Sequence, residues 1–224
     1  MLRLRVITGI TLALGVVTLL WWGPNWGVKA FLGLVCLIGL FEYASLERQI
    51  LPDDEQAQPD NFKIVHFVGL GGFLGWTLAP QHGLLIAGLS VIGVTIIHTI
   101  RCRNLPHALG RITWDTVGIF YVAGLLSIAT AIVGDSEAGS PSRALFLTFL
   151  AAVSSGDTLA YFTGRAVGKR PLAPILSPKK TMEGAAGGLA GSALGAYLVW
   201  YFLNVPGDLH WLIITALVAG SCAQ

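Results

Sequence analysis

Long apolar runs alternate with short polar segments along almost the whole chain. A helix of about 20 apolar residues crosses the hydrocarbon core of a bilayer, which sets the length to look for. On that basis the pattern predicts eight membrane-spanning helices, at residues 6–22, 27–46, 63–80, 83–100, 112–133, 144–164, 185–203 and 209–224. The expected fold is therefore an all-α, polytopic integral membrane protein in which residues 1–224 form a single transmembrane domain.

The composition supports this prediction. Of the 224 residues, 54% are hydrophobic and only 12% are charged, whereas a soluble domain carries about a quarter charged residues. The net charge of +2 is too small to indicate a nucleic-acid partner. Cys36, Cys102 and Cys222 lie far apart, in or beside apolar runs, so we interpret them as packing residues and not as a disulfide framework or a metal cluster.

The first apolar run has the charged start of a secretion signal but not its end. Arg3 and Arg5 precede it, and it closes in "LLWWGPNWG" at residues 19–27. Signal peptidase needs small residues at that point, whereas tryptophan is typical of a membrane–water interface. We therefore expect a retained first membrane helix.

The basic residues indicate the orientation. With the N-terminus in the cytoplasm, only Lys29 and Arg143 of the 14 lysines and arginines fall on the outer side, which leaves 12 on the cytoplasmic side. Cytoplasmic loops of membrane proteins carry such an excess. The sequence thus predicts a multi-pass protein of the cell (inner) membrane with its N-terminus in the cytoplasm.

The polar segment between the sixth and seventh runs is unusually rich in charge. It reads "GRAVGKRPLAPILSPKKTMEGAAGG", residues 164–188, with five cations and three prolines. The prolines predict a stiff, extended path that ends at a helix start. The free N–H groups and positive dipole of such a start favour phosphate, and Ser177 and Thr181 add hydroxyl groups while Glu183 is a candidate cap or base. An anion site and a simple anchor for anionic lipid headgroups both fit these charges.

Asp157 favours the anion site. It interrupts the sixth run, eight residues before Arg165, which on a helix is about 12 Å from the cytoplasmic end. A carboxylate at that depth is costly unless it is paired or faces water, so it is a functional candidate, with a hydrogen bond to a neighbouring helix as the alternative. A carboxylate near clustered cations is typical of a magnesium–phosphate site.

Other polar residues within the apolar runs have simpler interpretations. Asp115 follows Arg111 by four residues, which predicts a local ion pair. The histidines are scattered without metal-ligand spacing, and we interpret them as interface or packing residues.

The stretch "SGDTLAYFTGRAVGKRPLAPILSPKKTMEGAAGG", residues 155–188, closely resembles the phosphatidate cytidylyltransferase family, the CDP-diacylglycerol synthases. The segments "RLRVITGI", "FEYASL" and "YVAGLLS" are similar to it as well. The resemblance implies a membrane enzyme that converts CTP and phosphatidate into CDP-diacylglycerol and pyrophosphate at a site open to the cytoplasm. It also implies Mg²⁺ as cofactor and membrane lipids as neighbours. A homodimer is one of the assemblies that would fit such a protein.

The resemblance also implies roles for particular residues. Asp157 and Lys180 would be catalytic, with Asp157 also the metal ligand. The substrate-binding residues would be Ser177, Lys179, Thr181, Glu183, Gly184, Arg165, Lys169 and Tyr161.

Two other functions remain open at this point. A polyprenol or dolichol kinase-like enzyme also uses CTP at a membrane, although the order of residues in "SPKKTMEG" favours the cytidylyltransferase. A non-catalytic transporter or scaffold is the third hypothesis. A transporter is expected to show paired broken helices in two halves, and the pattern contains only one such place.

The family pattern continues beyond the last residue of this chain, which ends in "AGSCAQ" after a short eighth run. We therefore expect residues 1–224 to contain the N-terminal and central parts of the fold without the C-terminal catalytic segment. The 224-residue form should be inactive alone. An assay with CTP, phosphatidate and Mg²⁺ checks this, and turnover by the purified chain would contradict it.

Overall fold

The computed structural model describes residues 2–50, 62–101, 105–134, 136–174, 177–205 and 207–223. Their contacts form two compact units, one of residues 1–23 with 136–224 and one of residues 24–135. Both units are helical, and the described part of the first also contains a small hairpin. The single transmembrane domain expected over residues 1–224 stays a prediction.

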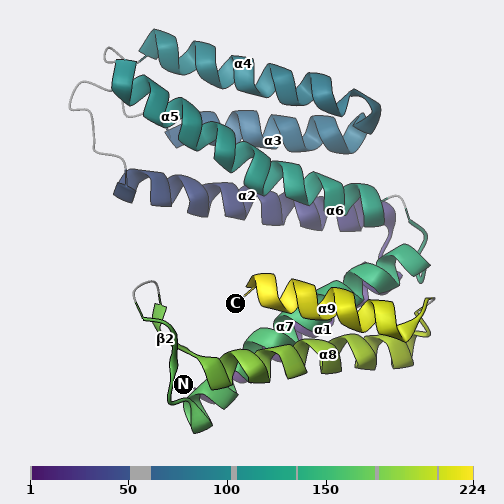
Figure 1. Ribbon diagram of the computed structural model, residues 1–224. Coiled ribbons are helices and arrows are strands. Elements are labelled where there is room, and N and C mark those ends of the chain that lie inside the picture. Colours follow the sequence, from purple (N-terminus) through teal and green to yellow (C-terminus); the bar gives the residue numbers. More distant parts are fainter. Residues whose placement is uncertain are drawn as a thin grey trace. The chain divides into compact units, whose positions relative to one another are not determined.

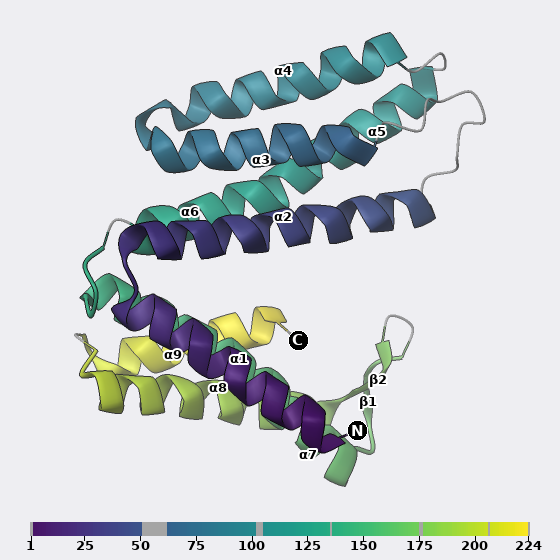
Figure 2. The ribbon, with the colours of Figure 1, turned by 180° about the vertical axis from the view of Figure 1, so that it is seen from behind.

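The first unit combines the start of the chain with its second half. Its elements are α1 (Leu2–Trp22), α7 (Pro141–Val167), β1 (Pro171–Ala173), β2 (Ser177–Thr181), α8 (Met182–Leu203) and α9 (Leu209–Ala223). The start of α1 lies at the same end of the unit as the cationic hairpin in both views (Figures 1 and 2).

The second unit is a bundle of long helices (Figure 1). Its elements are α2 (Asn25–Ile50), α3 (Phe62–Leu78), η2 (Pro80–His82), α4 (Gly83–Arg101), α5 (Leu105–Gly118), η3 (Ile119–Gly124) and α6 (Leu125–Val133). The η3 segment is a π-helical stretch that joins α5 to α6 without a break.

Helices occupy all eight of the predicted apolar runs, which confirms the all-α, polytopic membrane fold. Within the described residues, five segments are long and apolar enough to cross a bilayer: Asn25–Leu46, Pro80–Ile100, Ala108–Val133, Pro141–Val167 and Met182–Leu203. Thr11–Trp22 and Leu209–Ala223 are shorter apolar helices. The count of eight spans and the orientation of the N-terminus stay predictions.

Helices α7 and α8 pack unusually closely. A Cβ atom on Gly191 would lie 2.6 Å from the carbonyl oxygen of Ser155, and one on Gly184 would lie 3.2 Å from the Cα of Gly164. The Ser155 hydroxyl donates a hydrogen bond to the Gly191 carbonyl oxygen at 2.8 Å. Small residues and hydrogen bonds between helices hold membrane helices together, because burial of apolar surface gives little driving force in lipid.

Arg143 joins α7 to the end of α1. Its side chain is fully buried, and Nη1 donates hydrogen bonds to the carbonyl oxygens of Leu20 at 3.2 Å and Gly23 at 2.7 Å. The last carbonyl groups of a helix lack partners within the helix and carry partial negative charge, so a buried cation there satisfies and stabilises them.

The α7–α8 contact leads to a stability prediction. Gly191→Ala should lower the free energy of unfolding by about 1–3 kcal/mol, because the added methyl group meets backbone that has no room to move. Gly15→Ala in α1 is the matched control, since a Cβ at Gly15 has no atom within 4 Å. Thermal denaturation of the purified variants in detergent measures both, and equal stability of the two variants would contradict the close contact.

Candidate functional site

The residues expected to carry chemistry lie on α7, β2 and α8 of the first unit, except Lys169, which lies between α7 and β1. Asp157, Tyr161 and Arg165 are on the last turns of α7. Lys179 and Lys180 are on β2, and α8 begins directly after that strand. Because α7 and α8 pack side by side, the end of α7 and the hairpin before α8 lie at one end of the unit (Figures 1 and 2).

One face of α7 is polar. Asp157, Tyr161 and Arg165 recur at intervals of four residues, which places them on one side of the helix, and all three are exposed. Nη1 of Arg165 donates a hydrogen bond of 2.9 Å to the Tyr161 hydroxyl oxygen. This bond holds the guanidinium group against the helix surface, where it remains open to an anion.

The Asp157 carboxylate is exposed within a segment apolar enough to span a membrane. No hydrogen-bond or ion-pair partner of it lies in the part of the chain that the structure describes. The alternative expected from the sequence, a hydrogen bond to a neighbouring helix, is therefore not seen among these residues. An ionised carboxylate at such a depth needs water or a cation beside it.

The segment between α7 and α8 is extended, as its prolines predict. Strands β1 and β2 pair antiparallel, with Pro171 opposite Thr181 and Ala173 opposite Ser177. Lys169, Lys179 and Lys180 are exposed, and Ser177 is half-buried. The hairpin thus presents several cations at the end of the unit where α7 ends.

The start of α8 differs from the expectation of free N–H groups. Thr181 caps the helix, and its hydroxyl oxygen accepts a hydrogen bond of 3.1 Å from the N–H of Gly184. The N–H of Met182 donates to the Arg170 carbonyl oxygen at 2.8 Å. The prediction was wrong for these two groups, because the cap and the returning chain already use them. The exposed cationic side chains remain the candidates for anion binding.

Two of the expected substrate-binding residues have clear structural contacts. Gly184 is buried, and a Cβ there would lie 3.0 Å from the Ala160 carbonyl oxygen. The Glu183 carboxylate accepts hydrogen bonds from the backbone N–H groups of Lys169 and Arg170. The substrate-binding roles implied for both residues stay predictions.

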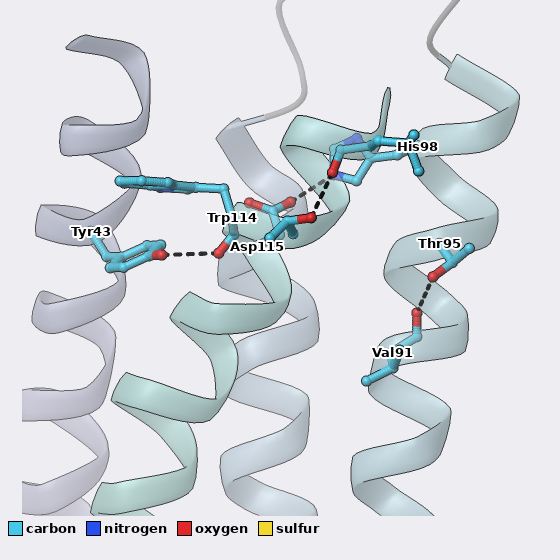
Figure 3. Close-up of polar contacts among 8 residues, drawn as sticks. Tyr43, Val91, Thr95, His98, Trp114 and Asp115 are labelled. Atoms are coloured by element: carbon cyan, nitrogen blue, oxygen red, sulfur yellow. Dashed lines mark hydrogen bonds and ion pairs between the residues drawn. The ribbon is translucent and has the colours of Figure 1, made fainter. Parts of the chain in front are cut away.

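A second polar cluster lies in the helical bundle of residues 24–135 (Figure 3). His98 of α4 and Asp115 of α5 are buried, and Nε2 of His98 lies 2.7 Å from Oδ2 of Asp115. The hydroxyl of Tyr43 on α2 donates to the carbonyl oxygen of Trp114 at 3.0 Å. These contacts tie α2, α4 and α5 together at one level of the bundle.

Sequence reasoning missed this pair of buried groups. The expected partner of Asp115 was Arg111, and that ion pair stays a prediction, whereas the contact in the structure is with His98, 17 residues earlier. The interpretation of His98 as an interface or packing residue did not include its hydrogen bond to Asp115. The sequence did contain a signal, because His98 and Asp115 are ionisable residues in neighbouring apolar runs. Such residues need polar partners within a membrane, and each could have been expected to supply the partner of the other.

Comparison with known proteins agrees with the family resemblance seen in the sequence. The model of the Cytidylyltransferase family matches residues 3–224. A phosphatidate cytidylyltransferase of Brucella abortus is 31% identical over 219 residues, 97% of this chain and 74% of the relative. Another, from Haemophilus influenzae, is 28% identical over 91% of this chain and 74% of the relative. The uncharacterized protein YnbB of Escherichia coli is 26% identical over 100% of this chain and 72% of its own length.

The buried pair leads to a second stability prediction. His98→Leu and Asp115→Leu should each lower the free energy of unfolding by about 3–5 kcal/mol, because each leaves its partner buried and unpaired. The double variant should lose clearly less than the sum, since it removes both polar groups. A double-mutant cycle by denaturation in detergent measures this coupling. Additive losses would show that the two side chains do not stabilise each other.

Proposed function

The chain belongs to the Cytidylyltransferase family, and from that premise we propose that it is a CTP-dependent nucleotidyltransferase acting on phosphatidate. The products are CDP-diacylglycerol and pyrophosphate, in phospholipid biosynthesis. The observation that supports this most is the juxtaposition of an exposed carboxylate, Asp157, on a membrane-spanning helix with the cationic hairpin at the end of the same helix. The names of the two phosphatidate cytidylyltransferase relatives favour this lipid as the acceptor.

The reaction joins two polyanions. An oxygen of the lipid phosphate attacks the α-phosphorus of CTP, and the bond from that phosphorus to the bridging oxygen of the β-phosphate breaks, so that pyrophosphate leaves with the electron pair. Exposed cations near this phosphorus reduce the repulsion and stabilise the charge of the transition state. We assign Lys180 to a phosphate group, with Lys179, Lys169 and Arg165 as further cations.

The hydroxyl groups of the hairpin have a supporting role. Thr181 accepts the hydrogen bond of the Gly184 N–H, and its own O–H remains able to donate to a phosphate oxygen, because a hydroxyl both donates and accepts. Ser177, opposite Ala173 in the hairpin, offers a second hydroxyl. The Tyr161 hydroxyl orients the Arg165 guanidinium.

Mg²⁺ is the proposed cofactor, and the residues present fit it. This ion prefers one or two carboxylates together with phosphate oxygens and water. Asp157 supplies an exposed carboxylate without a partner among the described residues, and the nucleotide would supply other ligands. When bound, the ion neutralises part of the phosphate charge.

We place the protein in the cell (inner) membrane with the hairpin facing the cytoplasm. The distribution of basic residues supports this orientation, since 12 of the 14, all but Lys29 and Arg143, then face the cytoplasm. The shared end of α1 and the hairpin is consistent with it (Figure 2). On this side the site would meet CTP from solution and phosphatidate from the membrane.

The test is an assay with radiolabelled CTP, Mg²⁺ and phosphatidate, run on detergent-purified protein made from the whole reading frame. CDP-diacylglycerol is the expected product. Lys180→Ala should lower kcat by about 100-fold, the usual effect of removing one group that stabilises transition-state charge. Asp157→Asn should raise the Mg²⁺ concentration needed for half-maximal rate.

The matched control is Glu137→Gln, an exposed acidic residue near the opposite end of α7, which should leave the rate unchanged. Absence of CDP-diacylglycerol from the unsubstituted protein would overturn the proposal. Phosphorylated polyprenol formed from CTP would favour the kinase-like enzyme, and solute flux without nucleotide would favour a transporter.

A further inference from the structure

Glu183 links the start of α8 to the chain that follows α7. Its Oε2 atom accepts a hydrogen bond of 3.0 Å from the backbone N–H of Lys169 and one of 3.2 Å from the N–H of Arg170. An acidic residue in the first turn of a helix ordinarily serves the helix itself, through its dipole and its first N–H groups. Here the carboxylate also reaches residues 13 and 14 positions earlier in the chain.

Other contacts strengthen the same connection. The Met182 N–H donates to the Arg170 carbonyl oxygen at 2.8 Å. The Gly168 N–H donates to the Gly164 carbonyl oxygen at 3.0 Å, which closes the end of α7. A Cβ on Gly168 would lie 2.7 Å from the Thr181 hydroxyl oxygen, so the chain passes directly against the cap of α8. The backbone of residues 168–170 is therefore fixed on both sides.

The side chains of this fixed segment are left at the surface. Lys169 and Arg170 are exposed, as are Lys179 and Lys180 on β2. Lys169 and Arg170 directly precede β1, and Lys179 and Lys180 lie within β2. The Glu183 hydrogen bonds fix the backbone of Lys169 and Arg170. The two side chains remain exposed, so their charged groups can reach a ligand from a fixed backbone position.

We propose that Glu183 is a positioning residue, which holds the Lys169 and Arg170 backbone so that the two cationic pairs face the phosphate groups of the nucleotide as one preorganised set. Arg170 thereby joins the phosphate-binding residues. Fixing charged groups before binding lowers the entropy lost when the ligand binds. Both N–H groups bind Oε2, so this oxygen of the carboxylate is engaged in holding the backbone of residues 169 and 170.

Hydrogen exchange tests the hydrogen bonds without any need for turnover. In detergent, the peptide that contains Lys169 and Arg170 should take up as many as two additional deuterons at early times in Glu183→Ala, because two N–H groups lose their acceptor. Glu183→Gln keeps an oxygen acceptor and should retain most of the protection. Glu137→Ala is the matched control and should leave this peptide unchanged. Equal protection in Glu183→Ala and the unsubstituted protein would overturn the proposal.

The kinetic arm rests on the proposed function and uses the same variants of the whole protein. Glu183→Ala should raise the KM for CTP by about tenfold with a smaller change in kcat, the size expected for loss of a charge-assisted hydrogen bond. Glu183→Gln should rescue the KM to within about threefold, since a neutral acceptor gives a weaker bond. Gln as damaging as Ala would indicate direct catalysis or metal binding and would overturn the positioning role. If the unsubstituted protein makes no CDP-lipid, the proposed function fails, while hydrogen exchange still decides the role of Glu183.

Discussion

Helices α7 and α8 approach so closely that glycine is required where their backbones meet. Gly164 and Gly184 face each other near the ends that carry the site, and Ser155 bonds across to the Gly191 carbonyl oxygen further along. The candidate site residues lie on these two helices, on the hairpin between them or, for Lys169, just before that hairpin. A larger residue in this contact would separate the polar face of α7 from the cations of the hairpin, so the packing of small residues sets the geometry of the site.

Ionisable groups within the apolar helices are either buried with a partner or exposed. His98 and Asp115 are buried and satisfy each other across α4 and α5, which makes them part of the structure of their bundle. Arg143 is buried too, with the end of α1 as its acceptor. Asp157 is exposed and has no such partner among the described residues. This difference is the reason why Asp157 is the proposed metal ligand, whereas His98, Asp115 and Arg143 are interpreted as structural.

The positions of the helices followed from the sequence because apolar length and proline placement are local properties. The runs around residues 112–133 and 144–164, for example, became the rod from α5 to α6 and helix α7. The extended path through Pro171 and Pro178 was predicted for the same reason. The polar stretch with Asp157 and Lys180 was also visible, since charges in apolar surroundings stand out. The proposed roles of these residues still depend on experiment.

What the sequence determined by itself was the membrane fold, the helix positions and the family, because hydropathy, turn residues and a long motif are all written along the chain. Only the tertiary structure decided the partners. Asp115 pairs with His98, and the N–H groups of Met182 and Gly184 bind acceptors within the chain. Glu183 accepts hydrogen bonds from the N–H groups of Lys169 and Arg170. Such contacts depend on which helix faces are brought together and on how closely their backbones approach. The spacing of residues within one element does not contain that information.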